Sequence, residues 1–300
     1  MILYCDFNPK LIRKYKVDKI NQGEENLIES NRFYASGYGI DMAVFSKKLF
    51  QDSKVLMLKG TAIGELIERD LRNLYIETES IKLKDDNIEK LIFQADDNKT
   101  IFTSKAPRIT MEDKADIQEE FAKQIKGKKA VAISLIDHES LNDDLYESLI
   151  KICYKENVHV LVNPSKLEDI KDSKPYLLIL DKKDALKDEK VNYTGDVPAF
   201  SKKLIDKGVG IVVVNSNRAT VVSTKDKNYR VYLEKISDFK AYNKTLMLAG
   251  FAVGLDRDYN IETTIKLAMA SSICENYMKF SQVQMSEIKK IMNEVKVEEM

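Results

Sequence analysis

From about residue 110 onward, short apolar segments alternate with longer amphipathic ones. Residues 130–136, 158–162 and 176–180 are apolar runs of strand length, whereas 143–157 and 197–207 carry apolar residues at helical spacing. Strands that alternate with helices of roughly 10–15 residues form parallel sheets, because each helix returns the chain across one face of the sheet. The pattern therefore predicts an α/β fold with a mostly parallel sheet that is covered by helices on both faces.

Residues 77–102 have a different pattern. Apolar residues alternate with polar ones around Ile81, Leu91 and Ile101, and polar turns separate the runs. Alternation of this kind predicts antiparallel strands. Together with residues 14–30 they predict a small second sheet that acts as a lid or as a dimer contact. We expect lid segments at approximately 12–34 and 77–104 within a single domain that spans residues 1–300.

Charge and cysteine content exclude several classes of protein. Lys plus Arg equals Asp plus Glu, at 48 each, so no bulk basic field favours nucleic acid. Cys5, Cys153 and Cys274 are far apart, which argues against a disulfide framework and fits a reducing cytosol. No run approaches the ~18 apolar residues of a membrane span, and the strand-like start does not resemble a signal peptide. We therefore predict a cytoplasmic protein without membrane contact.

Residues 240–255 read as a short loop that runs into an apolar helix. The start of a helix offers unpaired backbone N–H groups and suits phosphate, provided that the loop can approach closely, which usually needs glycine. This loop instead contains Tyr242, Asn243 and Lys244, with no glycine and no acid, and the whole chain has only 11 glycines. The position predicts a phosphate site, but the residues do not supply one.

Glycines recur between a strand and a helix at Gly37-Tyr38-Gly39. Such a loop either brings backbone close to a ligand at the carboxyl end of a sheet or simply forms a turn. Residues 60–64 leave the same two readings open. A lone GxG pattern does not choose between them.

Several motifs follow one another in a fixed order. They are Phe7-Asn8-Pro9, ASGYGIDMA at 35–43, GTAIGELIERDL at 60–71, APRIT at 106–110, NDDLY at 142–146 and AGFAVGL at 249–255. In this order they resemble the phosphofructokinase-B (PfkB, ribokinase-like) sugar kinases, in the branch that contains 1-phosphofructokinase and tagatose-6-phosphate kinase. The resemblance covers nearly the whole chain. It implies a ribokinase-like three-layer α/β/α core, a small β lid, a homodimer through the lid sheet, ATP and Mg²⁺ as cofactors, and a sugar phosphate as substrate.

The chain departs from this family at polar positions that the chemistry needs. The resemblance places the family's GAGD motif on residues 242–245, so the catalytic base is replaced by Thr245, and a neutral hydroxyl is no base near neutral pH. It places the sugar-binding Asp on Ile12 and the substrate-phosphate Arg on Ile88, and an apolar side chain cannot replace a fork of donors. The Lys and Asn of the sugar loop become Tyr38 and Asp41.

The resemblance also assigns candidate binding residues. Substrate would be held by Gly37, Gly39 and Asp41. The nucleotide would meet Asp181, which stands where the family has an Asn, and Lys244. No catalytic residue and no metal ligand is predicted, although Asp137, His138 and Glu139 form either a metal-binding group or a solvated loop.

Three hypotheses for function follow. The first is a catalytically impaired or inactive kinase homologue with a binding or regulatory role. The second is an active phosphotransferase on a sugar phosphate, with Asp41, Asp137 or Asp238 as the base and Lys244 as a phosphate contact. The third is a scaffold subunit that pairs with an active paralogue through the lid.

Overall fold

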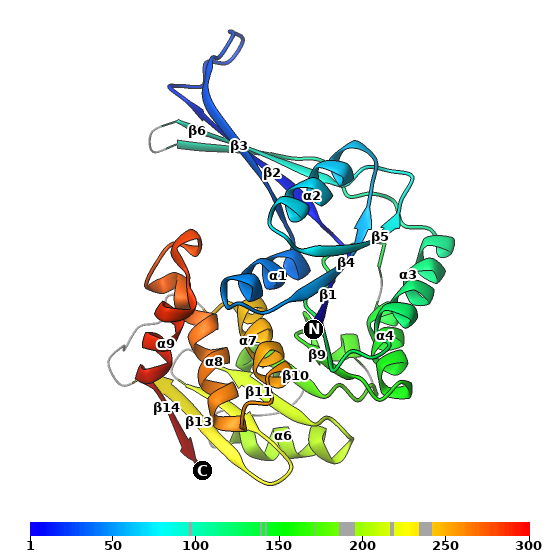
Figure 1. Ribbon diagram of the computed structural model, residues 1–300, viewed down its shortest axis with the longest axis vertical. Coiled ribbons are helices and arrows are strands. Elements are labelled where there is room, and N and C mark those ends of the chain that lie inside the picture. The colour runs from blue at the N-terminus through cyan, green and yellow to red at the C-terminus, as the bar shows by residue number, and fades with distance from the viewer. Residues whose placement is uncertain are drawn as a thin grey trace.

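A ten-stranded sheet forms the centre of the molecule and a four-stranded sheet projects from it (Figure 1). The computed structural model describes residues 1–95, 98–138, 140–141, 143–170, 172–185, 196–216, 219–233 and 242–300, without the side chains of 143, 184 and 185. The strands of the large sheet lie in the order β14 (Val295–Glu299), β13 (Asn228–Leu233), β12 (Thr220–Ser223), β11 (Ile211–Asn215), β10 (Leu177–Asp181), β9 (His159–Val162), β8 (Ala130–Ile133), β1 (Ile2–Asp6), β4 (Ser53–Lys59) and β5 (Glu77–Lys82).

The pairing of this sheet is mostly parallel, as predicted. Neighbouring strands from β11 to β5 run parallel, and β12, β13 and β14 extend the sheet with antiparallel pairs. The last strand, β14, was not predicted. Its sequence alternates valine with charged residues, and only the pairing with β13 makes it a strand.

Helices cover both faces of the sheet. Ile2 and Tyr4 of β1 belong to one core cluster, whereas Leu3 and Cys5 belong to the other, because successive side chains of a strand point to opposite faces. The first face is covered by α1 (Tyr38–Lys48), α2 (Ala62–Asn73), α7 (Lys244–Asp256), α8 (Ile261–Ile273) and α9 (Met285–Glu294). The second is covered by α3 (Met111–Gln124), α4 (Asp143–Lys155) and α6 (Val197–Asp206). Short helices within the described ranges include η1 (Leu167–Ile170), α5 (Lys182–Ala185), η3 (Cys274–Asn276) and η4 (Phe280–Gln282).

The small sheet has the spatial order β3 (Ile28–Ser36), β2 (Lys10–Val17), β6 (Ile88–Ala95) and β7 (Asn98–Thr103). The predicted lid segment 77–104 was wrong at its start, because β5 pairs with β4 in the large sheet. The antiparallel pairing predicted within residues 77–102 is found between β6 and β7, whereas β2 and β6, which join the two lid segments, are parallel. An edge strand of the main sheet and a lid strand both alternate in polarity, so the pattern alone cannot separate them.

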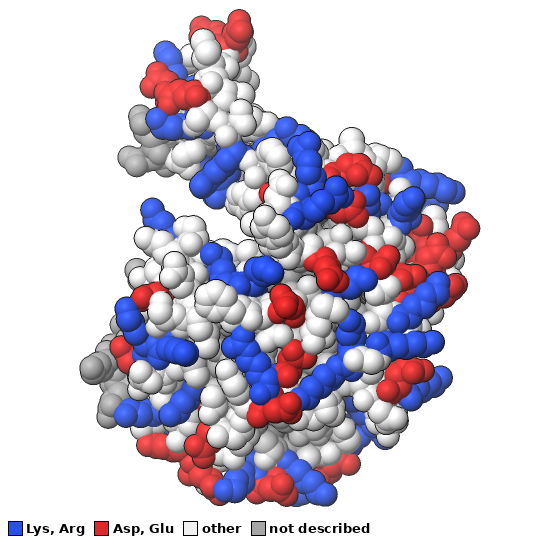
Figure 2. All heavy atoms as spheres, in the orientation of Figure 1, with Lys and Arg blue, Asp and Glu red and all other residues white. Residues whose placement is uncertain are grey.

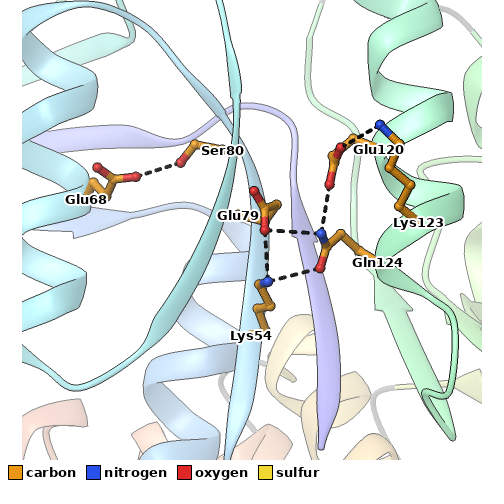
Figure 3. A network of polar contacts seen from close by, with 7 residues as sticks. All are labelled: Lys54, Glu68, Glu79, Ser80, Glu120, Lys123 and Gln124. Carbon is orange, nitrogen blue, oxygen red and sulfur yellow. Dashed lines mark hydrogen bonds and ion pairs between the residues drawn. The ribbon is translucent and has the colours of Figure 1, made fainter.

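Polar contacts fasten α3 to the edge of the large sheet (Figure 3). Lys54 Nζ lies 2.9 Å from Glu79 Oε2 and 3.0 Å from Gln124 Oε1, and Gln124 Nε2 donates to Glu79 at 3.1 Å. At the other end of α3, Thr110 and Asp113 form a capping box. Within the described part of the chain, no helix is both long and apolar enough to cross a bilayer.

Candidate functional site

The loop between β3 and α1 packs directly on the carboxyl end of β1. Gly37 has φ 154°, and a β-carbon there would overlap the Asp6 carboxylate. A β-carbon on Gly39 would overlap the carbonyl of Cys5. Both predicted glycines are therefore required by a close approach between the loop and β1.

Asp6 closes the N-terminus of α1 in place of a capping side chain. The N-cap residue is Gly37, which has no side chain, and the Asp6 carboxylate accepts hydrogen bonds from the N–H groups of Ile40 at 3.0 Å and Asn8 at 3.2 Å. Burial raises the pKa of Asp6 to about 6, against the lowering effect of these backbone donors. Sequence reasoning missed Asp6, although an acid at the end of a buried parallel strand is a recognisable signal for this edge.

Asp41 lies in the first turn of α1, beside Asp6. Its carboxylate accepts a hydrogen bond from Ser36 Oγ at 3.3 Å. Burial, and then the charge of Asp6, raises the pKa of Asp41 to about 7. The structure thus brings Gly37, Gly39 and Asp41 together with Asp6. The carboxyl groups of Asp6 and Asp41 lie side by side, and both have a raised pKa.

The N-terminus of α7 is closed by its own cap. The Asn243 side chain accepts from Leu246 N at 3.1 Å and donates to Glu275 at 2.9 Å. Thr245 is 7% exposed, and its hydroxyl lies 3.1 Å from Ser134 Oγ. The predicted loop followed by a helix is confirmed, and in the first turn of this helix the neutral hydroxyl of Thr245 pairs with that of Ser134.

Lys244 and Asp181, the two predicted nucleotide contacts, meet each other. Lys244 Nζ lies 2.8 Å from Asp181 Oδ2, and both side chains are partly exposed. The ammonium group is therefore held at the end of β10 by a carboxylate. At the described start of α7, Asn243 therefore caps the helix and Lys244 is paired.

Polar side chains continue along the carboxyl ends of neighbouring strands. Asn163 follows β9 and is fully buried, and its amide atoms have no hydrogen-bond partner among the described residues. Asn215 ends β11 and accepts from Thr220 Oγ1 at 3.0 Å. Burying an amide without hydrogen-bond partners costs free energy. The amide of Asn163 is therefore a donor and acceptor that the described residues leave unused.

The lid leaves the body at this same edge, directly after β1. Lys10, the first residue of β2, pairs with Asp137 at 3.7 Å, so the lid face that carries Lys10 looks toward the loop after β8. Ile88 shares this face, since it lies opposite Lys10, and Ile12 lies on it two residues further along β2. Neither isoleucine can donate a hydrogen bond to a ligand.

The remaining candidate residues, for a metal site or a catalytic base, do not form one group among the described residues. His138 is buried and its Nδ1 accepts from Ser140 N at 3.1 Å, whereas Asp137 is largely exposed. Glu139 and Asp238 lie outside the described residues. Among the residues that are described, no group of three or more His, Cys, Asp or Glu side chains is placed to hold a metal ion.

Comparison with known proteins adds independent findings. A sequence model described as pfkB family carbohydrate kinase matches residues 11–275. The chain is 22% identical to a 1-phosphofructokinase from Borreliella burgdorferi over 100% of this chain and 99% of the relative. It is also 22% identical to a tagatose-6-phosphate kinase from Staphylococcus epidermidis over 90% of each.

The fold is matched by solved structures as well. A Staphylococcus aureus protein provisionally named phosphofructokinase superposes with a TM-score of 0.90 at 19% identity, over 100% of this chain and 99% of that one. This likeness confirms the predicted ribokinase-like α/β/α fold with its smaller second sheet.

Proposed function

Because the chain belongs to the pfkB family of carbohydrate kinases, we propose that it is a sugar-kinase homologue that binds a small ligand without transferring a phosphoryl group to it. The observation that carries the proposal is the closed N-terminus of α7. Transfer to a hydroxyl needs a proton acceptor and donors aimed at the phosphoryl oxygens. Thr245 pairs with Ser134 instead, and Asn243 caps the helix.

The ligand that we propose is a sugar phosphate. It would bind at the edge of the large sheet where the parallel strands end, here named the carboxyl edge, and its binding would serve regulation. Carboxylates accept hydrogen bonds from sugar hydroxyls, and Asp41 and Asp6 lie together at the start of α1. The unpartnered amide of Asn163 supports a polar occupant of the same edge. Curated relatives that are named for sugar phosphates support this class of ligand.

Turnover decides whether phosphoryl transfer has been lost. ATP hydrolysis and ADP release would be followed with Mg²⁺ and either fructose 1-phosphate or tagatose 6-phosphate, beside an active relative as positive control. We expect no saturable turnover. Saturable turnover that disappears in Thr245→Val, which keeps the shape but removes the hydroxyl, would overturn the proposal.

Calorimetry on the same protein separates binding from chemistry. Either sugar phosphate should bind saturably, and Asp41→Asn should weaken that binding. Titration with Mg²⁺·ATP shows whether the nucleotide binds without turnover. Failure of both sugar phosphates to bind would contradict the ligand class while leaving the loss of transfer intact.

A second candidate is an active phosphotransferase that uses Asp41 as its base. The specific observation is the pKa of Asp41, raised to about 7, which suits a proton acceptor at neutral pH. On this hypothesis turnover exists in the natural protein, rises with pH through the pKa of Asp41, and is abolished by Asp41→Asn. Turnover that Asp41→Asn leaves unchanged would exclude this role.

We also propose a homodimer through one face of the lid, here named the aromatic face. Tyr15 stacks on Phe93 with ring centroids 5.0 Å apart, Phe93 meets Phe102 edge-on at 6.0 Å, and Phe33 lies in the same cross-strand row as Phe102. Phe33 is 40% exposed and Phe102 is 57% exposed. Aromatic side chains left open on a sheet are typical of a protein interface.

Light scattering after size exclusion tests the dimer. Phe102→Lys should yield a monomer. Ile101→Lys is the matched control, because Ile101 is the neighbouring residue, is 44% exposed and points to the opposite face of the lid. A natural protein that stays monomeric at high concentration would refute the homodimer, and a complex formed only with an active paralogue would favour the scaffold hypothesis.

A further inference from the structure

The opposite face of the lid, here named the basic face, carries cations on all four strands. Residues paired across a sheet point to the same side, so the register places the following residues together: Lys10, Lys14 and Lys16 of β2, Arg32 of β3, Lys90 of β6 and Lys99 of β7. The aromatic face has instead the ion pair of Arg13 with Glu89 at 2.6 Å. One sheet therefore has two chemically distinct sides.

The outer half of the basic face, at the end of the lid away from the large sheet, is hollowed into a groove. Two adjacent rows form it, one with Arg32, Lys14 and Ile92, the other with Lys16, Gln94 and Lys99. Same-face rows lie ~7 Å apart along the strands and neighbouring strands ~4.8 Å apart. These rows line a groove of about 510 Å³, within the usual size range of small-molecule sites.

A second groove, of about 410 Å³, lies between η1 and α6, where Lys174 and Lys207 are matched by Glu168 and Asp172. The groove on the lid has no such balance of charge among its described lining residues. The comparison singles out the lid groove as the one with an excess of positive charge.

The cations of this groove are largely unneutralised. Lys14 lies directly opposite Arg32 in the register, and like charges in that position destabilise a sheet. Glu29 pairs with Lys16 at 2.6 Å, but no described acid pairs with Lys14, Arg32 or Lys99. Lys14 is held over the ring of Tyr34 instead, 5.4 Å from its centroid. An anion in the groove would remove this repulsion.

We propose that the outer half of the basic face binds a small molecule with two or more phosphate groups. Several separated ammonium and guanidinium groups suit several phosphates, and the guanidinium of Arg32 offers a fork of donors. A nucleic acid polymer is disfavoured, because the whole chain has no net charge and the face of the molecule seen in Figure 2 mixes both signs. This site lies on the lid, apart from the carboxyl edge, so it goes beyond the proposed function.

Calorimetry of the full chain with inorganic pyrophosphate, and separately with Mg²⁺-free ATP, tests the proposal. In 50 mM NaCl we expect saturable binding that weakens as salt is added. The double variant Lys14→Gln/Arg32→Gln should bind at least tenfold more weakly. Without the anion it should be no less stable to heat than the natural protein, because a like-charge pair has been removed.

Two control variants locate the anion. Arg13→Gln removes a charge from the adjacent residue on the aromatic face, and Lys202→Gln removes an exposed charge on α6. Both should keep the affinity of the natural protein. The proposal is overturned if binding is absent, if the double variant binds as well as the natural protein, or if either control weakens binding as much as the double variant does.

Discussion

The N-termini of α1 and α7 lie at the same edge of the sheet and pack on the same face, yet they are closed in different ways. At α1 the chain keeps two glycines, and a carboxylate from another strand, Asp6, accepts the helix N–H groups. At α7 the cap is the local residue Asn243, and Lys244 and Thr245 follow it. The first arrangement depends on a distant contact and holds two carboxyl groups, whereas the second is local and has no carboxyl group among residues 243–245.

The difference shows that a helix start near a ligand edge does not by itself make a binding site. At α2 a third variant occurs, in which Asp86 accepts from Ile63 N at 2.9 Å. In each case a side chain of the protein occupies the donors that an anion would otherwise use. What distinguishes α1 is that its occupant is a buried acid with a second acid beside it.

The largest effect is expected from Gly37→Ala. A β-carbon would overlap the Asp6 carboxylate and φ would be strained, so the free energy of unfolding should fall by about 3–5 kcal/mol. Gly23→Ala is the matched control, because Gly23 has φ 80° but nothing within 4 Å, and it should lose only about 1 kcal/mol. Urea unfolding measures both values. Equal losses would mean that the contact with Asp6 does not matter.

The pH dependence of stability tests the paired carboxyl groups. The pKa of Asp6 is raised to about 6 and that of Asp41 to about 7, so the folded state holds these protons more tightly than the unfolded state does. Their contribution to stability is therefore present at low pH and is lost as pH rises through about 4 to 7. Asp41→Asn cannot titrate, so the natural protein should lose about 3 kcal/mol more than this variant between pH 5 and 8. Parallel pH profiles for the two proteins would contradict the pairing.

A smaller effect is expected from the local cap of α7. Asn243→Ala should lower the free energy of unfolding by about 1 kcal/mol, because one helix N–H loses its acceptor. Asn260→Ala removes the equivalent cap of α8, where Asn260 accepts from Thr263 N at 2.8 Å, and should cost the same. A much larger loss for Asn243 would show that its bond to Glu275 matters beyond capping.

The smallest effect is expected from Lys244→Met. The ion pair with Asp181 is partly exposed, so removing it should change the free energy of unfolding by less than about 1 kcal/mol. Thermal and urea unfolding would measure the change, with Lys202→Met as a control, because Lys202 forms an exposed pair with Asp206. A loss of several kcal/mol at Lys244 alone would show that the pair holds α7 against β10.

Local patterns predicted the elements of this site better than they predicted its contacts. The loop and helix around residues 242–256 and the turn before α1 could both be predicted, because each depends on residues a few positions apart. The start of the second lid segment was predicted wrongly, and the last strand, β14, was not predicted. Both depend on which partner a strand finds, and alternating polarity does not identify the partner.

The sequence by itself determined the alternation of strands and helices, the family, and the absence of an acid at Thr245, because each of these is written in residue type and spacing. Tertiary structure alone decided that Asp6 meets Gly37 and Ile40, that Lys244 meets Asp181, and that the lid separates an aromatic face from a basic one. The contact of Asp6 with Ile40 joins residues 34 positions apart, and that of Lys244 with Asp181 joins residues 63 positions apart. Local periodicity carries no information on contacts between residues so far apart in the sequence. Only the pairing of the strands into one sheet brings their carboxyl ends to one edge.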